Sequence, residues 1–167
     1  MSRQPRRPCR RRKWLVRTVM AVRACRRDNL TLLTSHGLQT WDILTALASL
    51  RGLKRKVFIP APSREEFERT AEYLAEQFSL QPALTQYEPV WYDKNEISNR
   101  EALVLRDEAI VGAADRLVPV SVKKDGNMAA LLSRYPDKER VDSFLTAYRP
   151  QEQTLAYEIA AYEISED

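Results

Sequence analysis

The sequence has little cysteine and histidine. Its 167 residues include two cysteines, Cys9 and Cys25, and a single histidine, with no C-x-x-C pair. Two cysteines cannot form a disulfide framework, and a structural zinc site needs four Cys or His ligands. We therefore expect no disulfide scaffold, no bound metal and no other cofactor, and a reducing, cytoplasmic setting.

The sequence also lacks a long apolar run. No apolar stretch approaches twenty residues and the mean hydropathy is −0.49, which argues against a transmembrane protein. The basic N-terminus is not followed by an apolar segment and a small-residue cleavage site, so we do not expect a signal peptide. The hydrophobic fraction of 44% excludes wholesale disorder, and the length fits one domain with a short appendage.

Positive charge is concentrated at the N-terminus. Residues 1–28 carry eleven Lys or Arg and one acid, a net charge of +10, whereas the remainder carries 16 bases and 22 acids, a net charge of −6. Residues 1–12 contain two prolines and are predicted to form an irregular arm. Either the arm contacts nucleic acid or phosphate, or it is solvated and keeps the chain soluble. The candidate nucleic-acid contacts are Arg3, Arg6, Arg7, Arg10, Arg11 and Arg12.

Helical and strand-like segments alternate along residues 13–167, which we expect to form one domain. The predicted helices cover residues 13–27, 40–50, 63–78, 100–113 and 128–133, and the predicted strands cover 30–34, 56–60, 84–92 and 117–122. Near-continuous apolar strands between helices are typical of a parallel sheet covered on both faces. We predict an α/β, Rossmann-like three-layer sandwich with a mainly parallel sheet of four or five strands. Segments 30–34, 57–60 and 117–122 should be buried neighbours, and the segment after Arg149 is either a strand or a helix.

A candidate ligand site follows the first predicted strand. Ligands of open α/β sheets bind beyond the carboxyl ends of the strands. Ser35, His36 and Gly37 lie there and lead into a helix whose N-terminus suits phosphate. Ser35 offers a hydroxyl, and Gly37 allows a close approach of the backbone. The alternative is an ordinary strand-to-helix turn in which the glycine adopts a positive φ.

Two titratable residues belong to this region. His36 is either a base or a donor to phosphate, although the sequence fixes no acid beside it. Asp42, in the first turn of the next helix, either matches the helix dipole or binds a ribose hydroxyl.

A second loop, residues 123–127, follows the strand predicted at 117–122. Its two lysines, Gly126 and Asn127 form either a second anion site or a solvated turn. Because parallel strands place their carboxyl ends together, this loop and residues 34–38 should flank one cleft. We expect the side chains of Ser35 and Arg106 to be partly exposed toward it. The sequence contains no G-x-G-x-x-G, G-x-x-x-x-G-K-[ST] or G-x-S-x-G motif, so standard dinucleotide, P-loop and hydrolase sites have no support.

The order of these segments resembles the SLOG superfamily of Rossmann-like domains, which includes DprA-like DNA-processing proteins and LOG-like phosphoribohydrolases. Residues 34–42 resemble the serine/glycine loop and following aspartate of DprA-like domains, 52–60 their next helix end and strand, and 106–117 their arginine-bearing helix and Ala-Asp-plus-strand signature. The resemblance covers residues 30–133. It implies a nucleotide or nucleotide derivative as ligand, held by Ser35, His36, Gly37, Asp42, Arg106, Gly126 and Asn127.

The sequence departs from this family in two places. Family members begin with a strand and a Gly-Ser-Arg-type loop, and Met1–Gln4 stand there instead, so either the chain start is truncated or the domain has lost one edge of its site. LOG-like enzymes carry a Pro-Gly-Gly-x-Gly-Thr loop followed by a glutamate, and residues 124–130 hold no acid at the glutamate's place. We therefore expect a nucleotide-binding module without turnover. The alternatives are a DprA-like single-stranded DNA-binding protein and a LOG-like nucleotide N-glycosidase, and homo-oligomerisation stays open.

Deleting residues 1–12 tests the arm as a DNA contact. The deletion removes six of the eleven basic residues of segment 1–28. If the arm neutralises phosphates, the affinity for labelled single-stranded DNA should fall steeply with salt in the full chain and lose that dependence in the deleted one. Equal affinity of the two proteins across the salt series would reject the arm as the contact.

Overall fold

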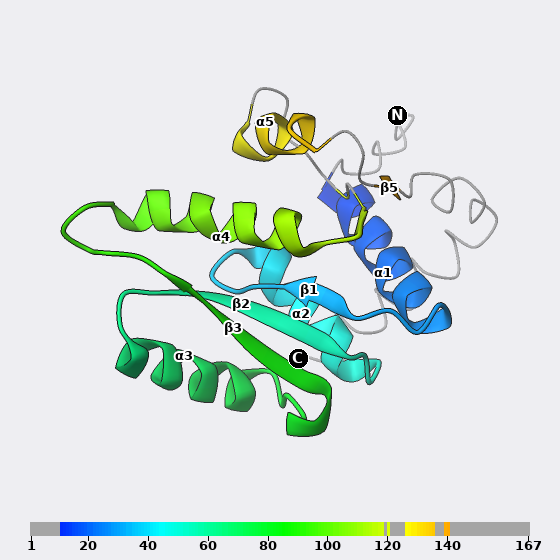
Figure 1. Cartoon of the computed structure of the whole chain (residues 1–167). Coiled ribbons are helices and arrows are strands. Elements are labelled where there is room, and N and C mark those ends of the chain that lie inside the picture. Colours follow the sequence, from blue (N-terminus) through cyan, green and yellow to red (C-terminus); the bar gives the residue numbers. More distant parts are fainter. Residues whose placement is uncertain (1–10, 119, 121–125, 136–138, 141–167) are drawn as a thin grey trace, which may run out of the picture.

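A computed structural model of the chain describes residues 11–118, 120, 126–135 and 139–140 (Figure 1). The helices are α1 (Arg11–Arg27), α2 (Gln39–Leu50), α3 (Arg64–Gln77), α4 (Asn99–Ala113) and α5 (Asn127–Ser133), with a short 3-10 turn over Pro82–Leu84. The strands are β1 (Leu32–Thr34), β2 (Arg55–Ala61), β3 (Thr85–Trp91), β4 (Arg116–Leu117) and β5 (Glu139–Arg140). No helix among these residues is long and apolar enough to cross a membrane.

The first three strands form one parallel sheet in the order β1-β2-β3. Leu32 pairs with Arg55, and Arg55 pairs with Thr85, so all three strands run the same way. Helices α2 and α3 connect the strands and cover one face of the sheet, while α4 covers the other (Figure 1). The α/β, Rossmann-like fold predicted from the sequence is confirmed.

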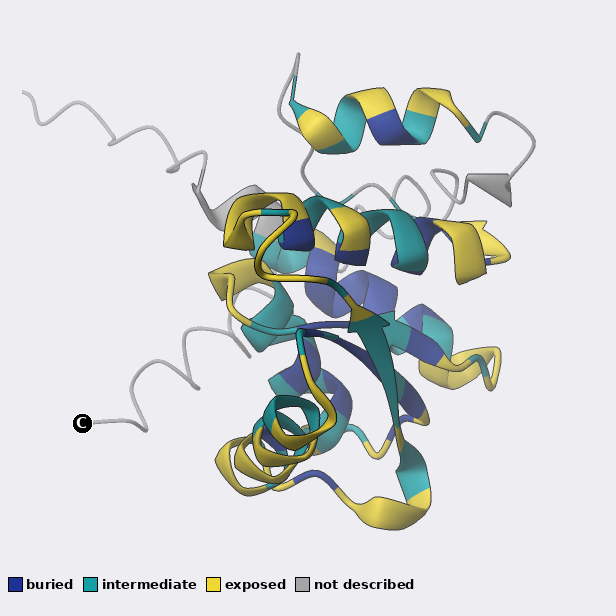
Figure 2. Cartoon of the chain, turned by 60° about the vertical axis from the view of Figure 1, so that its left-hand side comes forward, coloured by how far each residue is buried: buried dark blue, intermediate teal, exposed yellow. Residues whose placement is uncertain are grey.

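The unbroken apolar run at residues 57–59 lies in β2, the central strand of the sheet. Val57, Phe58 and Ile59 of β2 are 0%, 3% and 0% exposed, because each face of the strand is covered by a helical layer. Val57 and Ile59 pack with Leu74 of α3 and with Leu80. Figure 2 shows this buried centre between the helical layers, with the exposed residues on the outer faces of the helices.

The fourth predicted strand is placed differently from the prediction. Arg116 and Leu117 form β4, which pairs in parallel with β5 in a separate two-stranded sheet, while residues 119, 121 and 122 of the predicted strand lie outside the described residues. Leu117 is nevertheless buried, in a cluster with Val111 and Leu131 against which Leu33 of β1 packs. Side-chain packing, without ladder hydrogen bonds, therefore joins β4 to the region of β1.

The helix boundaries mostly follow the expected capping signals. Gly52 has φ +62° and its N–H donates to the carbonyl of Ser49, which closes α2 close to the predicted end of this helix. At the start of α3, Ser63 Oγ accepts from Glu66 N at 3.2 Å, but the Glu66 carboxylate pairs with Lys94. Only the serine half of a capping box is therefore formed at this helix start. Helix α1 begins at Arg11, two residues before the predicted start.

Truncation of Ile59 tests the buried face of β2. Ile59 is 0% exposed, and its side chain packs against α3. Ile59→Ala should therefore lower the free energy of unfolding by about 2–5 kcal/mol. The control is Tyr73→Ala on α3, whose side chain is 60% exposed and whose loss should change stability by at most about 0.5 kcal/mol. Urea titrations giving the same loss for both variants would contradict this assignment of the core.

Candidate functional site

Hydrogen bonds from buried hydroxyl groups fix the loop after β1. Ser35 is 0% exposed and its Oγ donates to the carbonyl of Phe58 at 2.7 Å. Thr45 Oγ1 donates to the Ser35 carbonyl at 3.0 Å and lies 2.9 Å from Thr34 Oγ1. The Ser35 hydroxyl thus ties β1 to β2, and the prediction that its side chain is exposed toward a cleft is wrong.

Arg106 of α4 is also fully buried, contrary to the prediction. Its Nη1 donates to the His36 carbonyl at 3.1 Å, and its Nε and Nη2 donate to Asp107 Oδ1 at 3.0 and 2.8 Å. The guanidinium carbon lies 5.7 Å from the centroid of the Trp41 ring. Arg106 therefore braces the loop from inside the protein. Its spacing in the sequence signals this position, because Ala102 and Ile110, four residues away on either side, share the same buried face.

His36 lies in this loop with its side chain half-buried. Its Nε2 is buried and has no hydrogen-bond partner among the described residues. Burial, and next the positive charge of Arg106, lower the pKa of His36, while Asp42 acts in the opposite direction. Both larger influences therefore favour the neutral imidazole.

Gly37 and Asp42 shape the start of α2. Gly37 has φ +85°, and its N–H donates to Asp42 Oδ1 at 3.1 Å. The N-cap residue, Leu38, makes no side-chain capping bond, so the first turn of α2 has only the Asp42 carboxylate nearby to match its dipole. The positive φ agrees with the alternative of an ordinary strand-to-helix turn, and Asp42 lies where a residue that matches the helix dipole is expected.

Gly126 and Asn127 stand at the start of α5. Gly126 is the N-cap residue, and Asn127 helps to line a small cavity of about 100 Å³ between α4 and α5, together with Asp107 and Glu108. Residues 123–125 lie outside the described residues, so the shared cleft between the two loops stays a prediction.

Of the predicted arm contacts, Arg11 and Arg12 belong to α1, and Arg3, Arg6, Arg7 and Arg10 lie outside the described residues.

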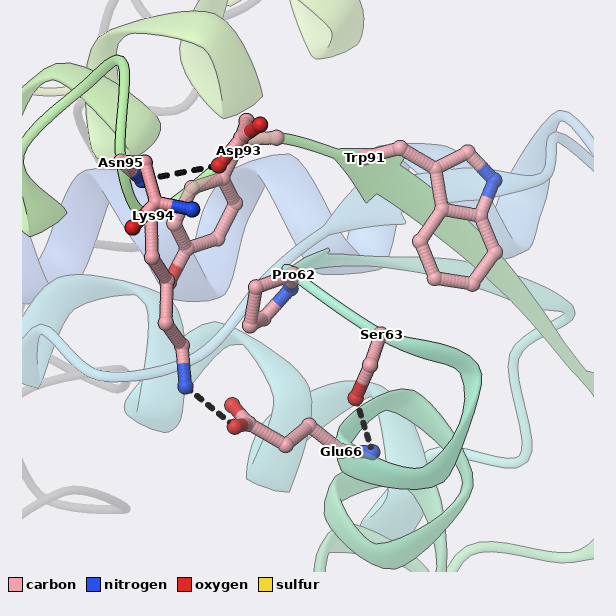
Figure 3. Close-up of a pocket in the computed structure, with 8 residues that line it drawn as sticks. Pro62, Ser63, Glu66, Trp91, Asp93, Lys94 and Asn95 are labelled. Atoms are coloured by element: carbon pink, nitrogen blue, oxygen red, sulfur yellow. Dashed lines mark hydrogen bonds and ion pairs between the residues drawn. The ribbon is translucent and has the colours of Figure 1, made fainter.

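A hollow larger than the cavity between α4 and α5 lies on the same edge of the sheet, beyond β2 and β3 (Figure 3). It measures about 620 Å³ and is lined by Pro62, Ser63, Glu66, Trp91, Tyr92, Asp93, Lys94 and Asn95. In Figure 3 the Trp91 indole lies on one side of Pro62, and the ion pair between Lys94 and Glu66 lies on the other. The hollow thus has one aromatic wall and one charged wall.

The aromatic wall is fixed but open to solvent. Trp91 is 53% exposed and its ring centroid lies 5.8 Å from that of Phe67 in α3, with the two ring planes tilted by 60°. The contact with Phe67 supports one part of the indole and leaves another part facing solvent. Tyr92 is linked to the sheet through its N–H, which donates to the Ala61 carbonyl at 3.3 Å.

The sequence prediction missed this hollow although the signal was present. The predicted sites follow the strands at 30–34 and 117–122, but every strand of the sheet is covered by the rule that ligands bind beyond carboxyl ends. Applied to 56–60 and 84–92, this rule selects Pro62–Ser63 and Trp91–Asp93, which the structure brings together.

Within the described residues, no cluster of three or more His, Cys, Asp or Glu side chains is placed to hold a metal ion.

Comparison with known proteins gives no match. No protein-family model matches this chain, and neither does any curated protein or solved structure. The resemblance to the SLOG superfamily therefore stays a prediction.

Replacing Arg106 tests its bracing role. Arg106→Leu removes the cation that holds the His36 carbonyl and leaves Asp107 without its partner, so the free energy of unfolding should fall by about 3–5 kcal/mol. As a matched control, Arg134→Leu breaks a surface ion pair with Glu108, which should cost about 1 kcal/mol or less. Comparable losses in urea unfolding of the two variants would show that Arg106 does not brace the loop.

Proposed function

We propose that this domain binds a nucleotide or a nucleotide derivative, with the base stacked on Trp91. The observation that carries the proposal is the half-exposed indole in a hollow of about 620 Å³ at the carboxyl edge of a parallel sheet. Hollows of this size suit small organic ligands, and open α/β sheets bind ligands at this edge. A planar base stacked on an aromatic side chain gains about 1–3 kcal/mol.

The polar groups of the hollow suit the sugar of such a ligand. The carboxylates of Glu66 and Asp93 are acceptors for ribose hydroxyls, the role that an acid near the end of a second strand fills in dinucleotide-binding folds. Ser63 Oγ already accepts from Glu66 N, so its own proton is free to be donated to a ligand oxygen. Lys94 is the one basic side chain in the lining and pairs with Glu66.

The phosphate of the ligand belongs toward the start of α2. That helix begins directly after β1, the strand beside β2, so its N-terminus opens at the same edge as the hollow. The first turn has no side-chain cap and carries the positive end of the helix dipole. Asp42 already accepts the Gly37 N–H there, and its negative charge opposes a second anion. We therefore propose that the base contributes more to affinity than the phosphate does.

We propose binding without turnover. N-glycosidic cleavage needs a group that donates a proton to the leaving base and charge stabilisation for the sugar cation. Of the two carboxylates in the hollow, Glu66 is engaged by Lys94 and Asp93 Oδ1 accepts the Asn95 N–H. A LOG-like N-glycosidase is the alternative, and released free base after incubation with nucleoside monophosphates would favour it. Single-stranded DNA binding is a separate proposal, which rests on the basic arm.

Removal of the indole tests the proposed function. Trp91→Ala should weaken binding of adenosine and guanosine monophosphates by about 1–3 kcal/mol, roughly fivefold to 150-fold in Kd, because the stacking surface is lost. Trp91→Phe should keep most of the affinity. Titration calorimetry measures all three proteins, together with Leu50→Ala, a change at another exposed apolar side chain, 61% exposed at the end of α2. Absence of nucleotide binding by the unmodified protein, or equal affinity of Trp91→Ala, would reject the proposal.

A further inference from the structure

His36 stands between a firmly held residue and two exposed ones. Ser35 before it is 0% exposed and is bonded to β2 through its hydroxyl, whereas Gly37 and Leu38 after it are exposed. Gly37 has φ +85°, and among the described residues beyond its chain neighbours no atom lies within 4 Å of the position that a Cβ would take. Residues 36–38, here named the His36 loop, therefore have a fixed end at Ser35 and open space at Gly37.

Two side-chain hydrogen bonds among the described residues hold the His36 loop closed. Arg106 Nη1 donates to the His36 carbonyl at 3.1 Å, and the Gly37 N–H donates to Asp42 Oδ1 at 3.1 Å. The first bond comes from α4 and the second from α2, which cover opposite faces of the sheet. A change that breaks either bond favours opening of the loop.

The imidazole of His36 occupies a position that does not suit a positive charge. An imidazolium carries a proton on each nitrogen, so the buried Nε2 would become a donor without an acceptor among the described residues. The charged groups that act on the ring are Arg106, which repels a cation, and Asp42, which attracts one but already accepts the Gly37 N–H. The Asp107 carboxylate beside them is bound by Arg106 itself.

We propose that the His36 loop is an acid-released latch, in which protonation of His36 breaks its contact with Arg106 and opens the loop at Gly37. The closed loop holds the neutral ring, whereas the open loop lets an imidazolium reach water. Acid therefore shifts the equilibrium toward the open loop. Opening separates the His36 carbonyl from α4 and releases the residues that precede α2.

The direction of the pH dependence follows from the two states of the loop. Burial, and next the positive charge of Arg106, lower the pKa of His36 in the closed loop, while Asp42 raises it. In the open loop the ring is in water and its pKa is about 6.5. The lowered pKa stabilises the closed loop at higher pH, and this stabilisation is lost as the pH falls from about 6.5 through the lowered value. The latch is thus closed at neutral pH and loosened by acid.

Amide hydrogen exchange of the full chain at pH 7.5 and 5.5 tests the latch. After correction for the intrinsic exchange rate, the opening constant of the Gly37 N–H should rise about threefold to tenfold at the lower pH, tenfold being the limit for one ordinary histidine. The Val57 N–H lies in the central strand and exchanges only when the whole domain opens, so its opening constant should be at least about tenfold smaller. In His36→Phe, which has no titrating ring, the Gly37 constant should change by less than about twofold.

Titration of the His36 ring protons by NMR is a second measurement that needs no substitution at position 36. The midpoint in the folded protein should lie below the midpoint in the urea-unfolded chain. Asp42→Asn should lower the folded midpoint further, because the attraction of this carboxylate is lost. Glu76→Gln is the matched control, because it removes the same charge from an exposed residue near the end of α3, and it should leave the midpoint unchanged.

A folded midpoint at or above that of the unfolded chain would overturn the proposal. It would also be overturned by an opening constant of Gly37 that is independent of pH, or that responds to pH equally in His36→Phe. A Gly37 constant equal to that of Val57 would overturn it as well, since the loop would then open only with the whole domain.

Discussion

The carboxyl edge of the sheet depends on one buried cation. Arg106 has no exposed surface, so its charge must be compensated within the protein, and the compensation comes from the Asp107 carboxylate, the His36 carbonyl and the face of Trp41. These partners belong to α4, to the loop after β1 and to α2. Helix α4 covers one face of the sheet and α2 covers the other, so a single side chain links both layers at the edge where ligands of this fold class bind.

The sequence was sufficient to predict the fold class because the βαβ pattern is local. Strands β1 and β2 contain short apolar runs, and each connecting helix has its own boundary signals, such as Gly52 after α2 and Ser63 before α3. The placement of β4 could not be predicted, because strand pairing depends on partners far along the chain. Leu117 is buried as expected, yet its ladder partner is Arg140, and no local pattern indicates that pairing.

The candidate site was predicted less well, since residue type alone does not show which way a side chain points. Ser35 and Arg106 have the chemistry of a phosphate site, but both are buried and hydrogen-bonded within the protein. Arginine side chains are usually exposed, so the prediction for Arg106 followed its residue type. The periodicity of α4 instead places Arg106 on the buried face of the helix. The hollow around Trp91 is formed by two segments about thirty residues apart in the sequence, which end side by side because β2 pairs with β3. Predicting the hollow therefore requires that pairing to be known.

The position of Pro89 affects how the domain behaves in a crowded solution. Among the described strands, β3 is the outer member of its sheet, and Pro89 lies inside it, opposite Ile59. An outer strand presents a row of unpaired N–H and C=O groups that can pair with another chain, and proline interrupts such a row because it has no N–H. Pro89 thus protects the strand that carries Trp91 against edge-to-edge aggregation. The indole of Trp91 can stay exposed with little risk of aggregation because the backbone beside it is a poor template for a further strand.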